Sequence, residues 1–225
     1  MSEAVSPPPA SARIILVGGG ARSGKSRFAL ARARRLGARR VFVATGQALD
    51  GEMTERIAAH VRTRGGDFRT IEEPLALPEA LEGIGDGGGD EGRRNGDEDG
   101  DEDEDEDEDG GRADVVVVDC LTLWLSNLVC RGDGEALIAE RVDALAGVLA
   151  RRRFHALVVT NEVGLGIVPE TPLGRLFRDV TGRAHQRLSA IADEIHLAIL
   201  GTILRLRPEP LAVAPRDLDP QEPPP

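Results

Sequence analysis

Lysine is nearly absent from this chain of 225 residues: among its 28 basic residues, Lys25 is the single lysine and the others are arginines. A coding bias towards arginine would explain the other basic positions. The exception lies inside a glycine-rich loop. Composition therefore suggests that Lys25 occupies a site where arginine does not substitute.

Cysteine is also scarce, and long apolar runs are missing. Cys120 and Cys130 are the two cysteines, and we expect both to be free thiols in a chain without signs of secretion. The first 13 residues include Glu3 and three consecutive prolines, and lack the basic start and apolar run of a signal peptide. No run approaches the roughly 18 apolar residues of a membrane span. We therefore expect a cytoplasmic protein with no membrane partner.

The net charge of −11 comes from one segment rather than from the whole chain. Residues 83–114 hold 16 acidic residues and three arginines, a net charge of −13, which leaves the remainder near +2. The pI reports this segment rather than a folded surface, so the pI supports no inference about partners. Separately, we expect no nucleic-acid partner.

The acidic segment cannot bury enough apolar surface to order itself. We expect a disordered and functionally neutral insertion over residues 83–114, because loop-closure entropy grows only slowly with loop length. It interrupts a single catalytic domain over residues 14–206. Residues 1–13 and the proline-rich tail 207–225 are expected to be disordered as well.

Short runs rich in Val and Ile alternate with stretches of helical periodicity. Strands are predicted at residues 14–17, 41–44, 115–118, 157–160 and 195–200. Helices are predicted at residues 26–36, 135–152 and 174–192. This alternation predicts an α/β fold with a mostly parallel sheet flanked by helices.

The strongest motif lies between the first predicted strand and the first predicted helix. Its residues are Gly19, Gly20, Ala21, Arg22, Ser23, Gly24, Lys25 and Ser26, which satisfy the P-loop pattern. Glycines let backbone N–H groups surround phosphate oxygens, the helix N-terminus adds positive potential, and Lys25 neutralises the outer phosphates. We expect Ser26 to bind Mg²⁺. The motif predicts a P-loop NTPase of RecA-like architecture; the alternative is a glycine turn that only caps a helix.

Two further strand ends carry polar residues. Val115–Val118 is followed by Asp119, the form of a Walker B element that holds the metal, although a solvent-facing Asp at a strand end looks the same. Residues 160–169 run from a strand into a loop with an acid and two glycines. Ligands bind at the carboxyl ends of parallel strands, but a bare turn remains the alternative for this loop.

A histidine follows the second predicted strand. Met53, Ile57 and His60 fall on one face of a predicted helix by their i, i+4, i+7 spacing. Spacing alone favours a packed or hydrogen-bonded histidine over a catalytic one.

Together these stretches resemble the bifunctional adenosylcobinamide kinase and adenosylcobinamide-phosphate guanylyltransferase family of cobalamin biosynthesis. The resemblance covers about residues 14–206 except the acidic insertion. The similar stretches are Gly19 to Arg27; Glu52-Met53, Arg56-Ile57 and His60; Asp119 to Thr122 with Asn127-Leu128; Asn161 to Pro169; and Leu173, Arg175, Phe177-Arg178-Asp179, Gly182-Arg183 and Gln186.

The resemblance implies two reactions with GTP and ATP as nucleotide substrates and Mg²⁺ as cofactor. A triphosphate would phosphorylate adenosylcobinamide, and GTP would then supply GMP through a covalent histidine, for which the matching position is His60. His60 and Lys25 would be catalytic, and Ser26 and Asp119 would bind the metal. The implied nucleotide contacts are Gly19 to Ser26, Ala44, Thr45, Gly46, Val61, Arg62, Thr63, Arg64, Glu72 and Asp119. The resemblance also suggests a homo-oligomer, with a trimer as one form.

The chain departs from the family pattern at a few positions. It has Arg64-Gly65 and Phe68 where the family has Arg-Pro and then Trp, and His185 where the family has Asn. Two other functions remain open on the sequence. One is a P-loop small-molecule kinase without guanylyl transfer, and the other is a nucleotide-gated interaction protein that uses its acidic loop.

Overall fold

The computed structural model describes residues 12–47, 65–87, 112–208 and 211–213, and it forms one α/β domain. The strands are β1 (Ile14–Gly19), β2 (Arg40–Ala44), β3 (Arg69–Glu72), β4 (Val115–Asp119), β5 (His155–Val159), β6 (Glu194–Ile199), β7 (Thr202–Arg207) and β8 (Leu211–Val213). The helices are α1 (Lys25–Arg34), α3 (Leu77–Asp86), α4 (Leu121–Arg131), α5 (Glu135–Ala150) and α6 (Pro172–Ile191), with a 3₁₀ turn η1 (Gly65–Asp67). Within these ranges no helix has the length and apolar character needed to cross a bilayer.

The strands form one sheet in the order β3-β2-β4-β5-β1-β6-β7-β8. The pairs from β3 to β6 are parallel, and β7 and β8 are added antiparallel at one edge. The predicted mostly parallel sheet flanked by helices is confirmed, and with the loop after β1 it is the P-loop NTPase fold. Because β5 lies between β1 and β4, the carboxyl ends of these three strands are neighbours, and the segments that follow them emerge side by side.

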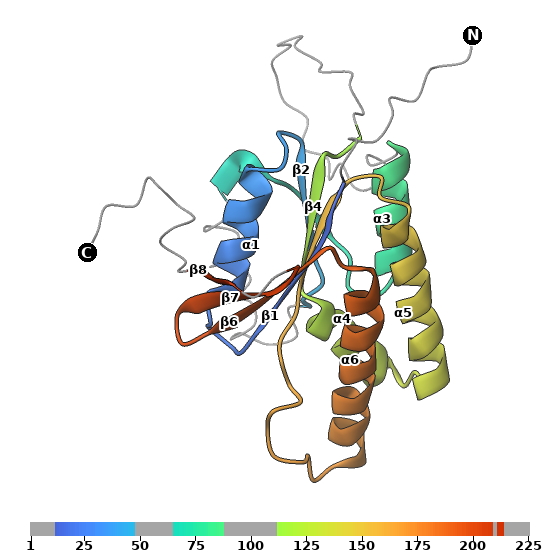
Figure 1. Ribbon diagram of the computed structural model, residues 1–225. Helices are drawn as coiled ribbons and strands as arrows, with labels where there is room; N and C mark the ends of the chain where they lie inside the picture. The colour runs from blue at the N-terminus through green and yellow to red at the C-terminus, as the bar shows by residue number, and fades with distance from the viewer. Residues whose placement is uncertain (1–11, 48–64, 88–111, 209–210, 214–225) are drawn as a thin grey trace, which may run out of the picture.

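Helices cover both faces of the sheet: α1 lies on one face, and α3, α4, α5 and α6 lie on the other (Figure 1). Successive residues of a strand point to opposite faces. Ile14 and Leu16 accordingly pack in the larger core beneath four helices, whereas Ile15 and Val17 pack in the smaller core with Phe28 of α1. Burial on both faces explains why the central strands read as continuous apolar runs.

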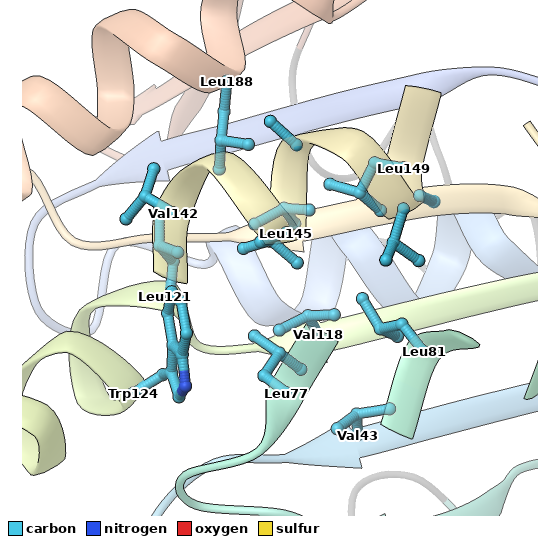
Figure 2. Close-up of a cluster of buried hydrophobic side chains, with 14 of the residues drawn as sticks. Val43, Leu77, Leu81, Val118, Leu121, Trp124, Val142, Leu145, Leu149 and Leu188 are labelled. Atoms are coloured by element: carbon cyan, nitrogen blue, oxygen red, sulfur yellow. The ribbon is translucent and has the colours of Figure 1, made fainter. Parts of the chain in front are cut away.

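The larger core joins the four helices to the sheet (Figure 2). Leu81 of α3, Trp124 of α4 and Leu145 of α5 are all fully buried beside the sheet residue Val118. The Trp124 indole N–H donates to the carbonyl oxygen of Leu75 at 2.9 Å, so its one polar atom is satisfied. Each such side chain stabilises the fold by about 1.5–3 kcal/mol. The larger core therefore fixes the positions of β1, β4 and β5, whose carboxyl ends form the site.

The predicted boundaries of the acidic insertion, residues 83 and 114, are both wrong, because each end includes residues of the folded domain. Gly83 to Asp86 form the last turn of α3. Ala113 is buried in the larger core, and the Asp114 carboxylate accepts hydrogen bonds from two backbone amides that precede β2. Both ends contact the domain because they bury apolar surface or satisfy backbone donors. Residues 88–111 lie outside the described part of the chain.

The predicted start of the disordered tail is also wrong. Arg207 is the last residue of β7, and Leu211–Val213 forms β8, which pairs antiparallel with β7. Prolines flank this short strand on both sides, and that composition suggested a tail without structure. A strand at the sheet edge needs only one neighbour for its hydrogen bonds, so flanking prolines do not prevent it.

Candidate functional site

The loop after β1 has the backbone that its glycines permit. A Cβ atom on Gly19 would lie 2.6 Å from the carbonyl oxygen of Ala198, so no side chain fits there. Gly24 has a φ of 91°, in the left-handed region that favours glycine. Gly19 and Gly24 are therefore required for the backbone conformation of the loop.

Helix α1 begins at Lys25 and has Gly24 as its N-cap, without a side chain to bind the first N–H groups. Such an uncapped terminus attracts anions through its N–H groups and the helix dipole. Lys25 has a relative exposure of only 8%, and its Nζ donates to the Gly20 carbonyl oxygen at 3.1 Å. The only lysine of the chain thus contacts the backbone of the loop in which it is predicted to bind phosphate.

A cleft of about 820 Å³ opens at these strand ends. Its lining comprises Ala21, Arg22, Ser23, Gly24, Lys25, Ser26, Arg27, Leu30, Asp119, Cys120, Thr122, Leu123, Ser126, Asn161, Glu162, Val163 and Phe177. The structure therefore brings together six predicted P-loop residues and Asp119. Gly19 and Gly20 supply the start of the loop behind this lining.

Asp119 ends β4 and carries an atom suited to a cation. Its Oδ2 is buried and has no hydrogen-bond partner in the described part of the chain. Ser26 lines the same cleft. Among the described residues no group of three or more His, Cys, Asp or Glu could hold a metal ion by itself. Mg²⁺ does not need such a group, since it commonly uses one or two protein ligands with water and phosphate oxygens. The residues present fit Mg²⁺.

Cys120 follows Asp119 and lies in the lining as a buried free thiol, while Cys130 is a free thiol at the surface. Burial raises the pKa of the Cys120 thiol, and the charge of Asp119 raises it further. The thiol is therefore protonated at neutral pH and is a poor nucleophile.

Thr45 joins β2 to β4 rather than lining the cleft. It is fully buried, and its Oγ1 donates to the Cys120 carbonyl at 2.7 Å and accepts from the Cys120 amide at 2.9 Å. The neighbouring predicted contact Ala44 is in register with Asp119, and Glu72 ends the edge strand β3. Ala44, Thr45, Gly46 and Glu72 all lie outside the cleft lining, and their nucleotide contacts stay predictions.

The lining includes Asn161 and Glu162, which belong to the predicted loop 160–169 but had no individual role predicted from the sequence. Asn161 donates through Nδ2 to Thr122 Oγ1 at 2.9 Å, which joins the end of β5 to the start of α4. The Glu162 amide donates to the Gly19 carbonyl at 3.1 Å, which joins the same segment to the P-loop. Their position after a predicted strand was the available signal, but which side chains enter the cleft depends on contacts distant in sequence.

His185 lies beside this segment. Its Nε2 is 2.7 Å from Thr160 Oγ1, and its Nδ1 is 3.8 Å from Glu162 Oε2. Burial lowers the pKa of His185, although the charge of Glu162 acts in the opposite direction. The ring is therefore neutral at pH 7.

His60, Val61, Arg62, Thr63 and Arg64 lie outside the described residues. Their predicted roles in guanylyl transfer and nucleotide binding stay predictions.

The chain matches the family model described as cobinamide kinase / cobinamide phosphate guanyltransferase over residues 15–88 and 98–206. It is 37% identical to the bifunctional adenosylcobalamin biosynthesis protein CobP of Pseudomonas aeruginosa, with 87% of this chain and 98% of that protein covered. It is 32% identical to the bifunctional adenosylcobalamin biosynthesis protein CobU of Escherichia coli, with 86% of this chain and 99% of that protein covered. Among solved structures, the KaiC-like protein PH0186 of Pyrococcus horikoshii OT3 aligns with 88% of this chain and 79% of its own, at 13% identity and a TM-score of 0.45.

The family model covers most of the chain, and both relatives align over nearly their whole length. The chain therefore belongs to the cobinamide kinase / cobinamide phosphate guanyltransferase family.

Proposed function

We propose that the chain is a bifunctional transferase of cobalamin biosynthesis. It phosphorylates the aminopropanol hydroxyl of adenosylcobinamide with ATP or GTP, and then transfers GMP from GTP to that phosphate, giving adenosylcobinamide-GDP and pyrophosphate. Family membership supports both reactions. The observation that carries the proposal is the single cleft in which Lys25 and the unpaired carboxylate oxygen of Asp119 lie together.

In the first reaction the P-loop backbone and the start of α1 bind the phosphates of the donor. Lys25 places its ammonium group against the outer phosphates, where negative charge increases in the transition state. Ser26 and Asp119 would hold Mg²⁺, which when bound neutralises phosphate charge. The same residues hold GTP for the second reaction.

In the second reaction we assign His60 the covalent role. A neutral ring nitrogen attacks the α-phosphorus of GTP, the bond from that phosphorus to the bridging oxygen breaks, and pyrophosphate leaves with the electron pair. A phosphate oxygen of adenosylcobinamide phosphate then attacks the same phosphorus and displaces the histidine nitrogen. His60 is thereby regenerated.

The covalent step is tested by incubating the protein with α-³²P-labelled GTP and no acceptor. We expect an acid-labile label on the wild type and none on His60→Asn. His155→Asn is the matched control, because His155 lies at the start of β5, at the end away from the cleft, and accepts from the Arg13 amide through Nδ1. An Asn oxygen can accept that bond, so this variant should retain the label.

Adding adenosylcobinamide then tests turnover. The label should move from the protein to the corrinoid product in the wild type. Label that persists on His60→Asn would remove His60 from the mechanism. Accumulation of adenosylcobinamide phosphate in the presence of GTP, with no protein label, would mean that the chain is a kinase without guanylyl transfer.

We further propose a homo-oligomer, with a trimer as one form, supported by the resemblance of the signature stretches to this family. Light scattering coupled to size exclusion measures the molar mass directly. A mass equal to that of one 24.0 kDa chain would contradict it.

A further inference from the structure

The segment after β5 lies between the two nucleotide-binding elements. β5 pairs with β1 on one side and with β4 on the other, so that Val159 is in register with both Val17 and Asp119. The chain that continues from β5 therefore passes between the P-loop and Asp119. Glu162 belongs to this segment and lines the cleft.

The backbone of this segment is held from both sides. The Glu162 amide donates to the Gly19 carbonyl at 3.1 Å. The Asn161 amide and side chain donate to Thr122 Oγ1 at 3.2 and 2.9 Å. Glu162 is thus placed relative to the phosphate-binding loop by direct contact rather than by a free loop.

The carboxylate of Glu162 is oriented but not saturated. Its Oε1 accepts the Gly164 amide at 2.7 Å, and its Oε2 lies 3.8 Å from His185 Nδ1, beyond hydrogen-bond length. No described residue donates a hydrogen bond to Oε2. The side chain is 33% exposed, so water can reach it.

The other groups of the cleft are unsuited to accepting a proton. Among the described lining residues only Asp119 and Glu162 carry carboxylates, and Asp119 is the one that fits the cation. The Cys120 thiol is buried with its Sγ 3.1 Å from Thr122 Oγ1, and the amide of Asn161 is not a base at neutral pH. Glu162 is therefore the remaining carboxylate.

We propose that Glu162 is the catalytic base of the phosphorylation step, an assignment that rests on the proposed function. The acceptor hydroxyl places its proton on Glu162 Oε2 as its oxygen bonds to the γ-phosphorus. The bond from that phosphorus to the bridging oxygen breaks, and the nucleoside diphosphate leaves with the electron pair. Glu162 then returns the proton to solvent.

This role separates the two reactions, because guanylylation of the enzyme by GTP involves no acceptor hydroxyl. Glu162→Gln keeps the shape of the side chain and an oxygen for the Gly164 amide, but cannot accept the proton. Single-turnover phosphorylation of adenosylcobinamide should fall by about 10²- to 10⁴-fold. Labelling of the enzyme with α-³²P-labelled GTP should stay within about threefold of wild type, as should the nucleotide KM.

Two further variants complete the experiment. Glu162→Asp keeps a carboxylate one methylene further back and should recover part of the lost rate. Glu170→Gln alters an exposed acid of the same segment that does not line the cleft, and should phosphorylate like wild type. Circular dichroism checks that all three variants are folded.

The outcomes distinguish this inference from the proposed function. Phosphorylation by Glu162→Gln within about threefold of wild type overturns the inference and leaves the proposed function intact. An equal loss of phosphorylation and labelling also overturns it, because Glu162 would then serve nucleotide binding. A wild-type protein that forms neither product overturns the proposed function and the inference with it.

Discussion

At the scale of single residues, the substitution Lys25→Arg tests whether the P-loop requires a lysine. Its side chain is almost fully buried, with Nζ 3.1 Å from a loop carbonyl oxygen, and the wider planar guanidinium of arginine cannot take that position. We expect Lys25→Arg to lower both phosphorylation and protein guanylylation by on the order of 10²-fold. Rates of both reactions, measured on folded protein, test this.

The matched control for that variant is Arg35→Lys, the reverse exchange at the exposed end of the same helix. It should change neither rate by more than about twofold, because it lies outside the cleft. Activity of Lys25→Arg close to wild type would show that the lone lysine reflects composition and not chemistry.

Glu194 makes a second residue-scale prediction, one of pH dependence. It lies under α1, with Oε1 2.9 Å from guanidinium nitrogens of both Arg13 and Arg32, and Oε2 3.1 Å from His196 Nε2. The hydrogen bond from His196, with the charge of Arg32, lowers the pKa of Glu194 from 4.5 to about 2 against the opposing effect of burial. This ionised carboxylate therefore stabilises the fold above pH 4.5, and the stabilisation is lost as pH falls towards 2.

We expect Glu194→Gln to lower the free energy of unfolding at pH 7 by about 1–2 kcal/mol, a value reduced for solvent screening. The deficit should shrink below pH 4.5 and disappear near pH 2. Urea unfolding of both proteins across this range measures it. The exposed Glu140→Gln on α5 is the control. A deficit independent of pH would contradict the assignment.

A site residue could be predicted from the sequence when the pattern that indicates it lies in neighbouring positions of the chain. The P-loop needs only eight consecutive residues in a strand–loop–helix context, so Lys25 and its neighbours could be predicted directly from the sequence. Asp119 needed one more feature, the apolar run before it. Glu162 had the same kind of signal, but its bond to Gly19 spans over a hundred positions, and no local pattern contains such a contact.

At the scale of elements, the Thr45 side chain links the end of β2 to the residue that follows β4. Thr45 Oγ1 makes two hydrogen bonds to the backbone of Cys120, and both residues are buried. Thr45→Val keeps the shape but leaves a buried amide and a buried carbonyl unpaired. We expect the free energy of unfolding to fall by about 2 kcal/mol, measured by urea denaturation.

The control is Thr70→Val on the edge strand β3, where the side chain is exposed. This change should alter stability by less than about 0.5 kcal/mol. Because Asp119 directly precedes Cys120, Thr45→Val should also weaken GTP binding. Unchanged stability of Thr45→Val would mean that water satisfies the freed groups.

Elements were predictable where burial produced a regular pattern. The five central strands and the helices α1, α5 and α6 follow from continuous apolar runs or helical spacing. Strand β3 did not, because three of its four residues are exposed at the sheet edge. Helix α4 did not, because its sequence LTLWLSNLVCR is apolar on most sides, and a buried helix of this kind lacks a clear polar face.

At the scale of the whole molecule, the acidic run can be separated from the fold. Residues 88–111 carry 14 acids and two arginines, so replacing them with an uncharged Gly-Ser linker changes the net charge from −11 to near +1. The free energy of unfolding should change by less than about 1 kcal/mol, because loop-closure entropy depends weakly on length. Turnover and the KM for GTP should stay within about twofold of wild type at low and at physiological salt, in line with the expectation that the insertion is functionally neutral.

The wider deletion of residues 83–114 should behave differently. It removes the last turn of α3 with the buried Ile84, and also Asp114, which binds two backbone amides before β2. Loss of one such core side chain alone costs about 2–5 kcal/mol. We therefore expect the deletion of residues 83–114 to unfold at clearly lower urea concentration than the Gly-Ser replacement of residues 88–111. If the Gly-Ser replacement lowers the KM for GTP at low salt, the acidic run acts on the cleft through long-range charge, because salt at about 0.1 M screens charges separated by more than about 10 Å.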